Sequence, residues 1–270
     1  MPARPITFLS DYGLGDEFVG VVHGVIAGIC PAARIIDLGH GVPRQNVQTG
    51  ALMLARALPV VPAGVHLAVV DPEVGARRRA VALRTSEDER LLVGPDNGLL
   101  LPAAEKFGGV AEAVEISASP WRLEPVSATF HGRDVFAPVA ARLARGEPLS
   151  EAGAPLEPGE LVALEQTEAR HEDGALVAHV VGTDTFGNAM LDAGHEDLLS
   201  SGLKLGDAIA ARTASRRVRG VLARTFSDVA RGALLVYEDA GGSLALAVNG
   251  GDAAALLGLH TGDEVRLERA

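Results

Sequence analysis

Two carboxylates, one arginine and one histidine are the side chains most suited to act together in chemistry. Asp11 follows the apolar segment 6–9 and Asp71 follows the apolar segment 66–70. Both carboxylates are therefore expected at the carboxyl ends of strands, where open α/β sheets bind ligands. Either one alone would be explained as a turn former. Two of them at strand ends of one sheet favour a binding site.

Arg78 is the middle residue of an arginine triplet that follows Asp71 closely. Side chains alternate between the two faces of a strand, so Arg78 would point away from its two neighbours. We expect Arg78 to turn inward to a carboxylate while the flanking arginines remain solvated. The alternative is three solvated arginines at the start of a strand.

His131 lies in the segment Thr-Phe-His-Gly-Arg-Asp, residues 129–134. An imidazole has an unperturbed pKa of about 6.5, which suits proton transfer at neutral pH. A lone histidine is more often structural than catalytic. The other histidines show no metal-ligand spacing, so the sequence predicts no metal site. The segments 95–98 and 184–188 are explained by themselves as turns.

The first half of the chain must supply the elements that position these residues, and it alternates strands with helices. Its apolar spacing predicts helices over residues 18–29, 48–58 and 135–145, and strands over residues 6–9, 34–38, 66–70, 80–83 and 91–93. Asp134 is expected to cap the last of these helices. Such alternation indicates an α/β domain with a mainly parallel central sheet and helices on its faces.

The second half is typical of a smaller antiparallel β-barrel-like domain. Short strands are predicted over residues 176–181, 208–211, 217–222, 234–237, 244–248 and 264–267. The segment 146–160 is rich in Gly, Pro and Glu and divides the two halves. We therefore predict an N-terminal α/β domain over 1–150, a linker over 151–165 and a C-terminal β domain over 166–270.

Composition narrows the classes of protein that fit. The 270 residues are 47% hydrophobic and 22% charged, as in an ordinary globular protein. A net charge of -11 excludes a general nucleic-acid binder, which needs clustered Lys and Arg. The single cysteine, Cys30, allows no intrachain disulfide. No apolar run approaches the roughly 20 residues that cross a membrane, and no signal pattern is present, so a cytoplasmic protein is expected.

Five short segments, taken in order, resemble a known family. They are Phe-Leu-Ser-Asp-Tyr-Gly (8–13), Val-Asp-Pro-Glu-Val-Gly (70–75), Gly-Pro-Asp-Asn-Gly (94–98), Thr-Phe-His-Gly-Arg-Asp (129–134) and Phe-Gly-Asn (186–188). This ordered set is similar to that of the S-adenosyl-L-methionine (SAM) hydrolases, also called SAM hydroxide adenosyltransferases. Their relatives join fluoride or chloride to the 5' carbon of the same substrate. The resemblance implies cleavage of SAM by water into adenosine and methionine, with no cofactor.

The resemblance also implies catalytic roles. Asp71, Arg78 and His131 match an Asp, Arg and His set that the hydrolases share and the halide enzymes lack, which favours water as the nucleophile. Asp71 would be a water-orienting base, Arg78 an electrostatic anchor and His131 a second water ligand. Whether Asp71 or His131 takes the proton is left open.

Further positions are implied to bind the substrate: Asp11, Phe130, Asp184, Asn188, Phe226, Val248 and Asn249. The carboxylate of Asp11 would accept bonds from the ribose hydroxyls. Aromatic rings stack on bases, so Phe130 and Phe226 would flank the sugar or adenine, although core packing explains Phe226 equally well. Asp184 and Asn188 would approach the methionine end. Backbone near residues 248–249 would contact the adenine edge.

The architecture implied by the resemblance is a homotrimer. The substrate would lie between the N-terminal domain of one subunit and the C-terminal domain of the next. Two alternatives remain: a SAM-dependent chloride adenosyltransferase, and a non-catalytic protein that binds SAM or adenosine.

Overall fold

A computed structural model describes residues 2–165 and 167–270 of the chain. The chain divides into two compact units, Met1–Leu164 and Glu165–Ala270, and each is described by itself. The sequence places the first residues of its two predicted domains at 1 and 166, and both of these residues lie outside the described ranges.

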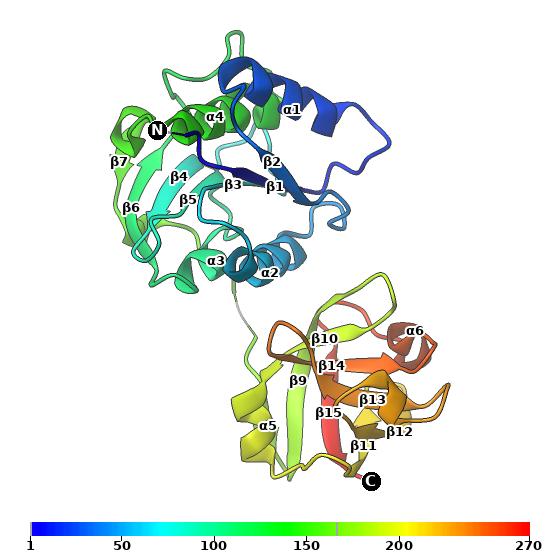
Figure 1. The fold of residues 1–270 in the computed structure, drawn as a ribbon. Coiled ribbons are helices and arrows are strands. Elements are labelled where there is room, and N and C mark those ends of the chain that lie inside the picture. Colours follow the sequence, from blue (N-terminus) through cyan, green and yellow to red (C-terminus); the bar gives the residue numbers. More distant parts are fainter. Residues whose placement is uncertain (1, 166) are drawn as a thin grey trace. The chain divides into compact units, whose positions relative to one another are not determined.

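The N-terminal unit is built on a seven-stranded sheet in the order β2-β1-β3-β5-β4-β6-β7 (Figure 1). The strands are β1 (Ile6–Ser10), β2 (Ile35–Gly39), β3 (Val65–Val69), β4 (Ala80–Thr85), β5 (Leu91–Pro95), β6 (Val110–Glu115) and β7 (Ala154–Leu156). Strands β2, β1, β3 and β5 pair in parallel. The pairings of β5 with β4, β4 with β6 and β6 with β7 are antiparallel. The α/β class is confirmed, with parallel pairing on one side of the sheet and antiparallel pairing on the other.

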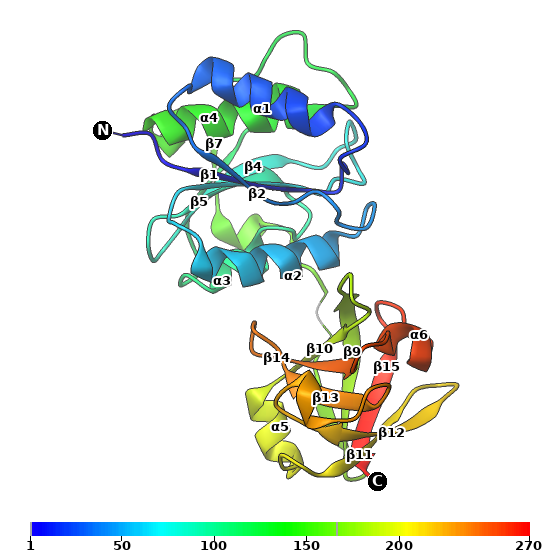
Figure 2. The ribbon, with the colours of Figure 1, turned by 45° about the vertical axis from the view of Figure 1, so that its right-hand side comes forward.

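Helices cover both faces of this sheet, as Figure 2 shows. The helices are α1 (Phe18–Ile29), α2 (Val47–Ala57), α3 (Leu101–Glu105) and α4 (Ala137–Arg145). Side chains of β1 alternate between the two faces of the sheet and so contribute to the hydrophobic core on each face. Phe8 packs with the buried residues of α1 and α4, and Leu9 packs with those of α2 and α3. Because both faces are covered, all five residues of β1 are buried.

The segment predicted as a linker contributes to the N-terminal sheet. Strand β7 lies within residues 151–165 and pairs with β6. Leu161 and Leu164 pack against the core that α2 and α3 cover. Gly98 explains this close fit, because a Cβ atom there would lie 2.5 Å from the Leu164 side chain.

The expected cap at Asp134 is wrong. Helix α4 begins at Ala137, and a π-helical turn over Gly132–Phe136 precedes it. Asp134 lies inside that turn, so its carboxylate points back to the preceding loop and accepts the N–H of Ser127 at 2.8 Å. The residue stabilises the loop before the helix and not the first turn of α4.

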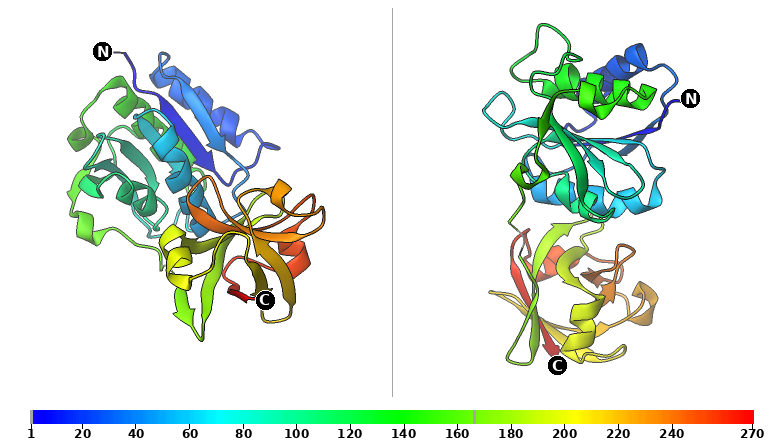
Figure 3. Two further views of the ribbon diagram at one scale, coloured as in Figure 1. Left: turned by 60° about the horizontal axis from the view of Figure 1, so that its bottom comes forward. Right: turned by 90° about the vertical axis from the view of Figure 1, so that its left-hand side faces the viewer.

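The C-terminal unit is a closed β-barrel (Figure 3). Its strands are β8 (Arg170–Glu172), β9 (Ala175–Thr183), β10 (Ala189–Gly194), β11 (Ala208–Arg212), β12 (Arg217–Leu222), β13 (Leu234–Glu238), β14 (Ser243–Val248) and β15 (Glu264–Arg269). The pairing of β10 with both β14 and β9 closes seven strands on themselves, and β8 adds to β9. Pairing is antiparallel except between β12 and β13. The short helices α5 (His195–Ser201) and α6 (Ala253–Leu257) lie against the barrel.

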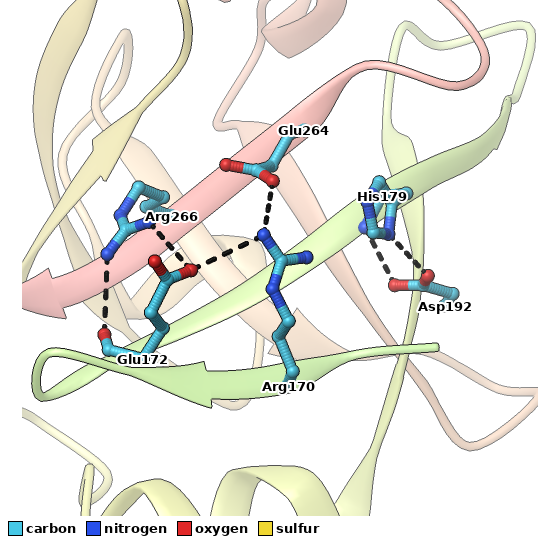
Figure 4. Close-up of polar contacts among 6 residues, drawn as sticks. All are labelled: Arg170, Glu172, His179, Asp192, Glu264 and Arg266. Atoms are coloured by element: carbon cyan, nitrogen blue, oxygen red, sulfur yellow. Dashed lines mark hydrogen bonds and ion pairs between the residues drawn. The ribbon is translucent and has the colours of Figure 1, made fainter. Parts of the chain in front are cut away.

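Ion pairs join β8 to β15, the two strands that flank β9 (Figure 4). Arg170 contacts Glu264 at 2.7 Å, and Glu172 contacts Arg266 at 3.2 Å. Nearby, Nδ1 of His179 lies 2.8 Å from Oδ2 of Asp192 and ties β9 to β10. Exposed pairs of this kind contribute little stability individually.

None of the helices in the described part of the chain is long and apolar enough to span a membrane.

Candidate active site

Asp11 and Asp71 follow neighbouring strands of the N-terminal sheet. Strands β1 and β3 pair in parallel with Ser10 opposite Val69, and the N–H of Asp11 donates to the carbonyl of Val69 at 3.3 Å. The two carboxylates therefore begin at the same edge of the sheet. Asn97, in the turn after β5, donates from Nδ2 to the carbonyl of Val70 at 2.9 Å. This contact fixes the backbone immediately before Asp71.

Asp71 forms a buried ion pair with Arg78. The Nε of Arg78 lies 2.9 Å from Oδ1 and 3.0 Å from Oδ2 of Asp71, and a terminal nitrogen of Arg78 also donates to Oδ2. Only 3% of the Arg78 side chain and 6% of the Asp71 side chain are exposed. Arg78 turns inward as predicted, while Arg77 is exposed and Arg79 pairs with Asp96.

His131 extends this pair into a chain of three residues. The same terminal nitrogen of Arg78 lies 2.8 Å from Nδ1 of His131. A guanidinium can only donate, so Nδ1 of His131 must be the acceptor, and the neutral ring carries its proton on Nε2. Burial, followed by the charge of Arg78, lowers the pKa of His131 below its ordinary value. His131 is thus a neutral ring whose outer N–H can donate to a ligand.

Close backbone approaches hold the segments that carry these three residues. Gly75 lies between Asp71 and Arg78 with a φ of +80°, and a Cβ there would lie 2.2 Å from the carbonyl oxygen of Ala128. Only glycine allows the 71–78 loop to approach the segment before His131 this closely.

Tyr12 fits against Gly132, the residue after His131. A Cβ on Gly132 would lie 2.0 Å from the Tyr12 hydroxyl oxygen. Burial, reinforced by the charges of Asp11 and Asp71, raises the pKa of the Tyr12 phenol, so it stays neutral. Tyr12 was not among the sequence-predicted site residues, because this contact joins residues far apart in the chain.

Phe130 belongs to an aromatic cluster at this edge of the sheet. Its ring is edge-on to Tyr12 at 5.9 Å and to Phe18 at 5.1 Å between centroids. The guanidinium of Arg133 lies over the Phe130 ring, 5.3 Å from the ring centroid, and also pairs with Asp134. Burial opposes the charge of Asp134, but the bonds from Arg133 and Ser127 outweigh it and lower the pKa of that carboxyl.

Asp11 presents its carboxylate beside the turn that follows β2. Its Oδ2 accepts the N–H of Gln45 at 2.9 Å, and Gln45 has a φ of +62°. Asp11 is half-buried, so part of the carboxylate is accessible to a ligand. The N-terminal unit thus brings together five predicted residues at one sheet edge: Asp11, Asp71, Arg78, Phe130 and His131.

The C-terminal unit carries the other predicted residues around a hollow of about 370 Å³. The hollow is lined by Phe186, Asn188, Phe226, Val248, Gly250 and Gly251. Three of these, Asn188, Phe226 and Val248, were predicted from the sequence. Phe186 belongs to the resembling segment 186–188 but was not predicted to bind the substrate, and 77% of it is exposed beside the hollow. Exposed aromatic side chains beside a hollow suit the stacking of a flat ring.

Asp184 and Asn249 do not line this hollow. The carboxylate of Asp184 accepts the backbone N–H of Asn188 at 2.9 Å and its Nδ2 at 2.8 Å, so Asp184 shapes the β9–β10 turn. Gly187 in this turn has no room for a side chain, since a Cβ would lie 2.2 Å from Asp252. Asn249 donates its backbone N–H to Ala233 and its side chain to Val229.

A partly buried Asp-Arg-His set at the strand ends of an α/β unit, together with a β-barrel that carries an aromatic-lined hollow, is typical of a two-domain enzyme that acts on a small molecule. Comparison with known families gives the class more closely. Residues 6–153 match the SAM hydroxide adenosyltransferase N-terminal domain, and residues 178–266 match the SAM hydroxide adenosyltransferase C-terminal domain. The chain belongs to this family, as the sequence resemblance indicates.

Individual relatives agree with this assignment. The chain is 50% identical over 266 residues to an (R)-S-adenosyl-L-methionine hydrolase of Salinispora tropica, covering 98% of each chain. It is 29% identical to a fluorinase of Nocardia brasiliensis, covering 98% of this chain and 97% of that one. Among solved structures, an uncharacterized conserved protein from Thermotoga maritima is 38% identical with a TM-score of 0.91, covering 98% of this chain and all of the other.

Proposed function

We propose that this protein hydrolyses S-adenosyl-L-methionine to adenosine and L-methionine by attack of water on the 5' carbon. The observation that carries the proposal is the partly buried chain of contacts from Asp71 through Arg78 to His131. The name of the Salinispora tropica relative, at 50% identity over nearly the whole chain, supports the same reaction.

The reaction needs a positioned nucleophile more than it needs an acid. SAM is a sulfonium ion, so methionine leaves as a neutral thioether and requires no proton. Water is a poor nucleophile and must be fixed in line with the bond from C5' to sulfur. Positioning alone can supply part of the roughly 7–11 kcal/mol available to well-oriented reactants.

Asp71 and His131 have complementary roles in this scheme. Because Nδ1 of His131 accepts from Arg78, its outer N–H donates to the water oxygen and stabilises the hydroxide that develops. A carboxylate offers about four lone-pair sites, and the bonds from Arg78 leave room for a water proton on Asp71. We therefore assign the proton to Asp71 and not to His131.

Other residues bind the substrate in this proposal. Asp11 accepts bonds from the ribose hydroxyls beside the catalytic set, and Phe130 flanks the sugar. The hollow formed around Phe226 and Asn188 receives the remaining part of the substrate, and Val248 contributes its backbone. No cofactor takes part, since the leaving group and the nucleophile need none.

The test is product analysis in halide-free buffer, run separately on each sulfur epimer of SAM. Adenosine and methionine are expected, and in water labelled with heavy oxygen the label must appear in the 5' hydroxyl of adenosine. The variant Asp71→Ala should turn over about 10²–10⁴-fold more slowly at saturating substrate, the usual contribution of a general base. Wild-type turnover by that variant would refute the assignment. Intact substrate after prolonged incubation would refute the reaction and support a binding protein, and 5'-chloro-5'-deoxyadenosine formed with added chloride would support the halide alternative.

We further propose that the protein is a cytoplasmic homotrimer whose sites combine the N-terminal unit of one subunit with the C-terminal unit of the next. The support is that each unit carries only part of the predicted set, and that the single cysteine needs no oxidising compartment. Light scattering measures the subunit number.

Subunit mixing tests where the site forms. Asp71→Ala and Phe226→Ala chains are unfolded and refolded together in equal amounts. If the site is shared between subunits, about a quarter of the interfaces in a cyclic trimer then combine an intact Asp71 with an intact Phe226. Activity above that of both separate variants is expected. A mixture no more active than the variants alone would place the whole site within one chain.

A further inference from the structure

Three side chains of the N-terminal unit converge at the end of β2. His23 lies on α1, Asp37 lies on β2, and His40 follows that strand. Nε2 of His23 is 2.9 Å from Oδ1 of Asp37, and Nε2 of His40 is 3.1 Å from the same oxygen. Within the described residues this is the one set of three or more such side chains whose ligand atoms all lie within 4.8 Å of one another.

His40 is the buried member of the set and is held for ligation. Only 3% of its side chain is exposed, and its Nε2 makes no hydrogen bond even though it points at Asp37. Its other nitrogen, Nδ1, lies 2.8 Å from Oγ of Ser10, which also accepts the N–H of Tyr12. Metal-binding histidines are oriented in this way by a partner on the second ring nitrogen. A buried nitrogen without a hydrogen bond therefore faces a carboxylate and an imidazole.

We propose that His23, Asp37 and His40 bind a divalent transition-metal ion of the zinc class. Two imidazoles and one carboxylate are donors that suit Zn²⁺, Co²⁺ or Ni²⁺, whereas Mg²⁺ and Ca²⁺ prefer oxygen alone. Ligand atoms about 2.0–2.2 Å from a tetrahedral ion are about 3.3 Å apart, so the two spacings to Asp37, 2.9 and 3.1 Å, need to open by only a few tenths of an ångström. The ligand atoms of His23 and His40 lie within 4.8 Å of each other.

Charge and access agree with such an ion. With neutral imidazoles the set carries the single negative charge of Asp37, which a divalent cation complements. The side chains of His23 and Asp37 are 34% and 43% exposed, so an ion can reach them from solvent and retain a water as its fourth ligand. Asp37 and His40 are three residues apart in the chain, but only the fold brings His23 on α1 to them, so spacing along the chain does not predict the complete set.

The proposed site lies outside the reacting set but next to it. The carbonyl of His40 accepts the N–H of Gly13 at 2.7 Å, in the turn that carries Asp11. A bound ion would tie α1 to the ends of β1 and β2 and so stiffen this turn. Its function is then structural support of the substrate edge, and none of its ligands belongs to the Asp71, Arg78 and His131 set.

The experiment uses untagged full-length protein that has been treated with chelator and desalted. Co²⁺ and Zn²⁺ are titrated by calorimetry, and Co²⁺ is also followed by its visible absorption. The wild type should bind one equivalent, and His23→Leu and Asp37→Asn should each bind at least about tenfold more weakly, since even an outer partner of a metal ligand contributes that much affinity. Zn²⁺ should raise the melting temperature of the wild type and not of these two variants.

His195→Leu is the matched control. His195 is exposed and its Nδ1 lies 2.9 Å from Glu238, so it reproduces the histidine–carboxylate pair of His23, and among the described residues no third ligand joins this pair. Its affinity for Co²⁺ should equal that of the wild type. Absence of binding by the wild type, or equal binding by His23→Leu and Asp37→Asn, would overturn the proposal. Circular dichroism establishes that each variant is folded.

Discussion

Replacing Arg78 by lysine isolates geometry from charge in the proposed catalytic set. Arg78 contacts both oxygens of Asp71 and Nδ1 of His131 through one planar group, and its guanidinium also packs 5.2 Å from the Phe136 ring centroid. A lysine keeps the positive charge beside Asp71. Its ammonium is a compact donor on a flexible stem and cannot reproduce the fixed fork of arginine.

The size of the effect follows from the contacts that lysine cannot keep. We expect Arg78→Lys to retain the ion pair with Asp71 and to lose the bond to His131. A hydrogen bond to a charged group contributes about 1.5–3 kcal/mol. If this contribution orients the water in the transition state, kcat should fall about 10- to 150-fold, with KM nearly unchanged.

Steady-state release of adenosine under saturating SAM measures this loss. Arg79→Lys is the matched control, because Arg79 is the next residue and pairs with Asp96 at 2.8 Å outside the set. Thermal melts of both variants report any shared cost to folding. If the two lysine variants turn over alike, the contact between Arg78 and His131 has no catalytic role and the proposed chain of three residues is refuted.

Three further predictions concern packing and pH. Gly132→Ala places a methyl group 2.0 Å from the Tyr12 hydroxyl oxygen, so kcat should fall by up to about 10²-fold because neighbouring side chains are displaced. The control Gly15→Ala meets nothing within 4 Å and should behave as wild type. Equal kcat values for the two variants would contradict this prediction. Because the pKa of His131 is lowered, its ring stays neutral, and kcat should be constant from about pH 8 to 6.5 and decline only below pH 6.5. A decline in kcat above pH 6.5 that depends on His131 would contradict this prediction. Burial lowers the pKa of His66 from 6.5 to about 3, so between these pH values the unfolded chain binds a proton that the folded chain does not. As the pH falls through this range, His66 should therefore lower the free energy of unfolding by up to about 1.4 kcal/mol per pH unit. Urea titrations at several pH values should show that this slope is absent in His66→Gln.

Local periodicity is enough to predict elements whose residues repeat regularly. The apolar spacing over 18–29 predicts a helix, and α1 spans Phe18–Ile29. The alternating segment 217–222 corresponds to β12. Elements with weak local signals are missed: β10 contains Ala, Asp and Gly, and α6 has only five residues, beginning after the N-cap Asp252. These elements depend on barrel closure and capping, which join residues distant in the chain.

The candidate site shows the same division between local and long-range information. Residue type and position after strands were sufficient to select Asp11 and Asp71, because parallel strands end at a common sheet edge. Arg78 turns inward as expected, but residues 77–79 precede β4, so strand alternation is not the reason for its direction. The contact of Tyr12 with Gly132 and the closure of the loop at Gly75 arise only in three dimensions, and so no pattern along the chain predicts them.

In the proposed reaction, the assembled set favours water over halide. A halide ion has no hydrogen to donate to Asp71 and is repelled by its negative charge, by about 1–4 kcal/mol at 4 Å before Arg78 compensates. Water can donate to Asp71 while it accepts from the outer N–H of His131, a pattern that a halide satisfies only in part. Because Arg78 fixes both the carboxylate and the tautomer of the ring, one guanidinium arranges an acceptor and a donor around the same position. In the proposed reaction, the contacts that activate water are therefore the ones that disfavour chloride.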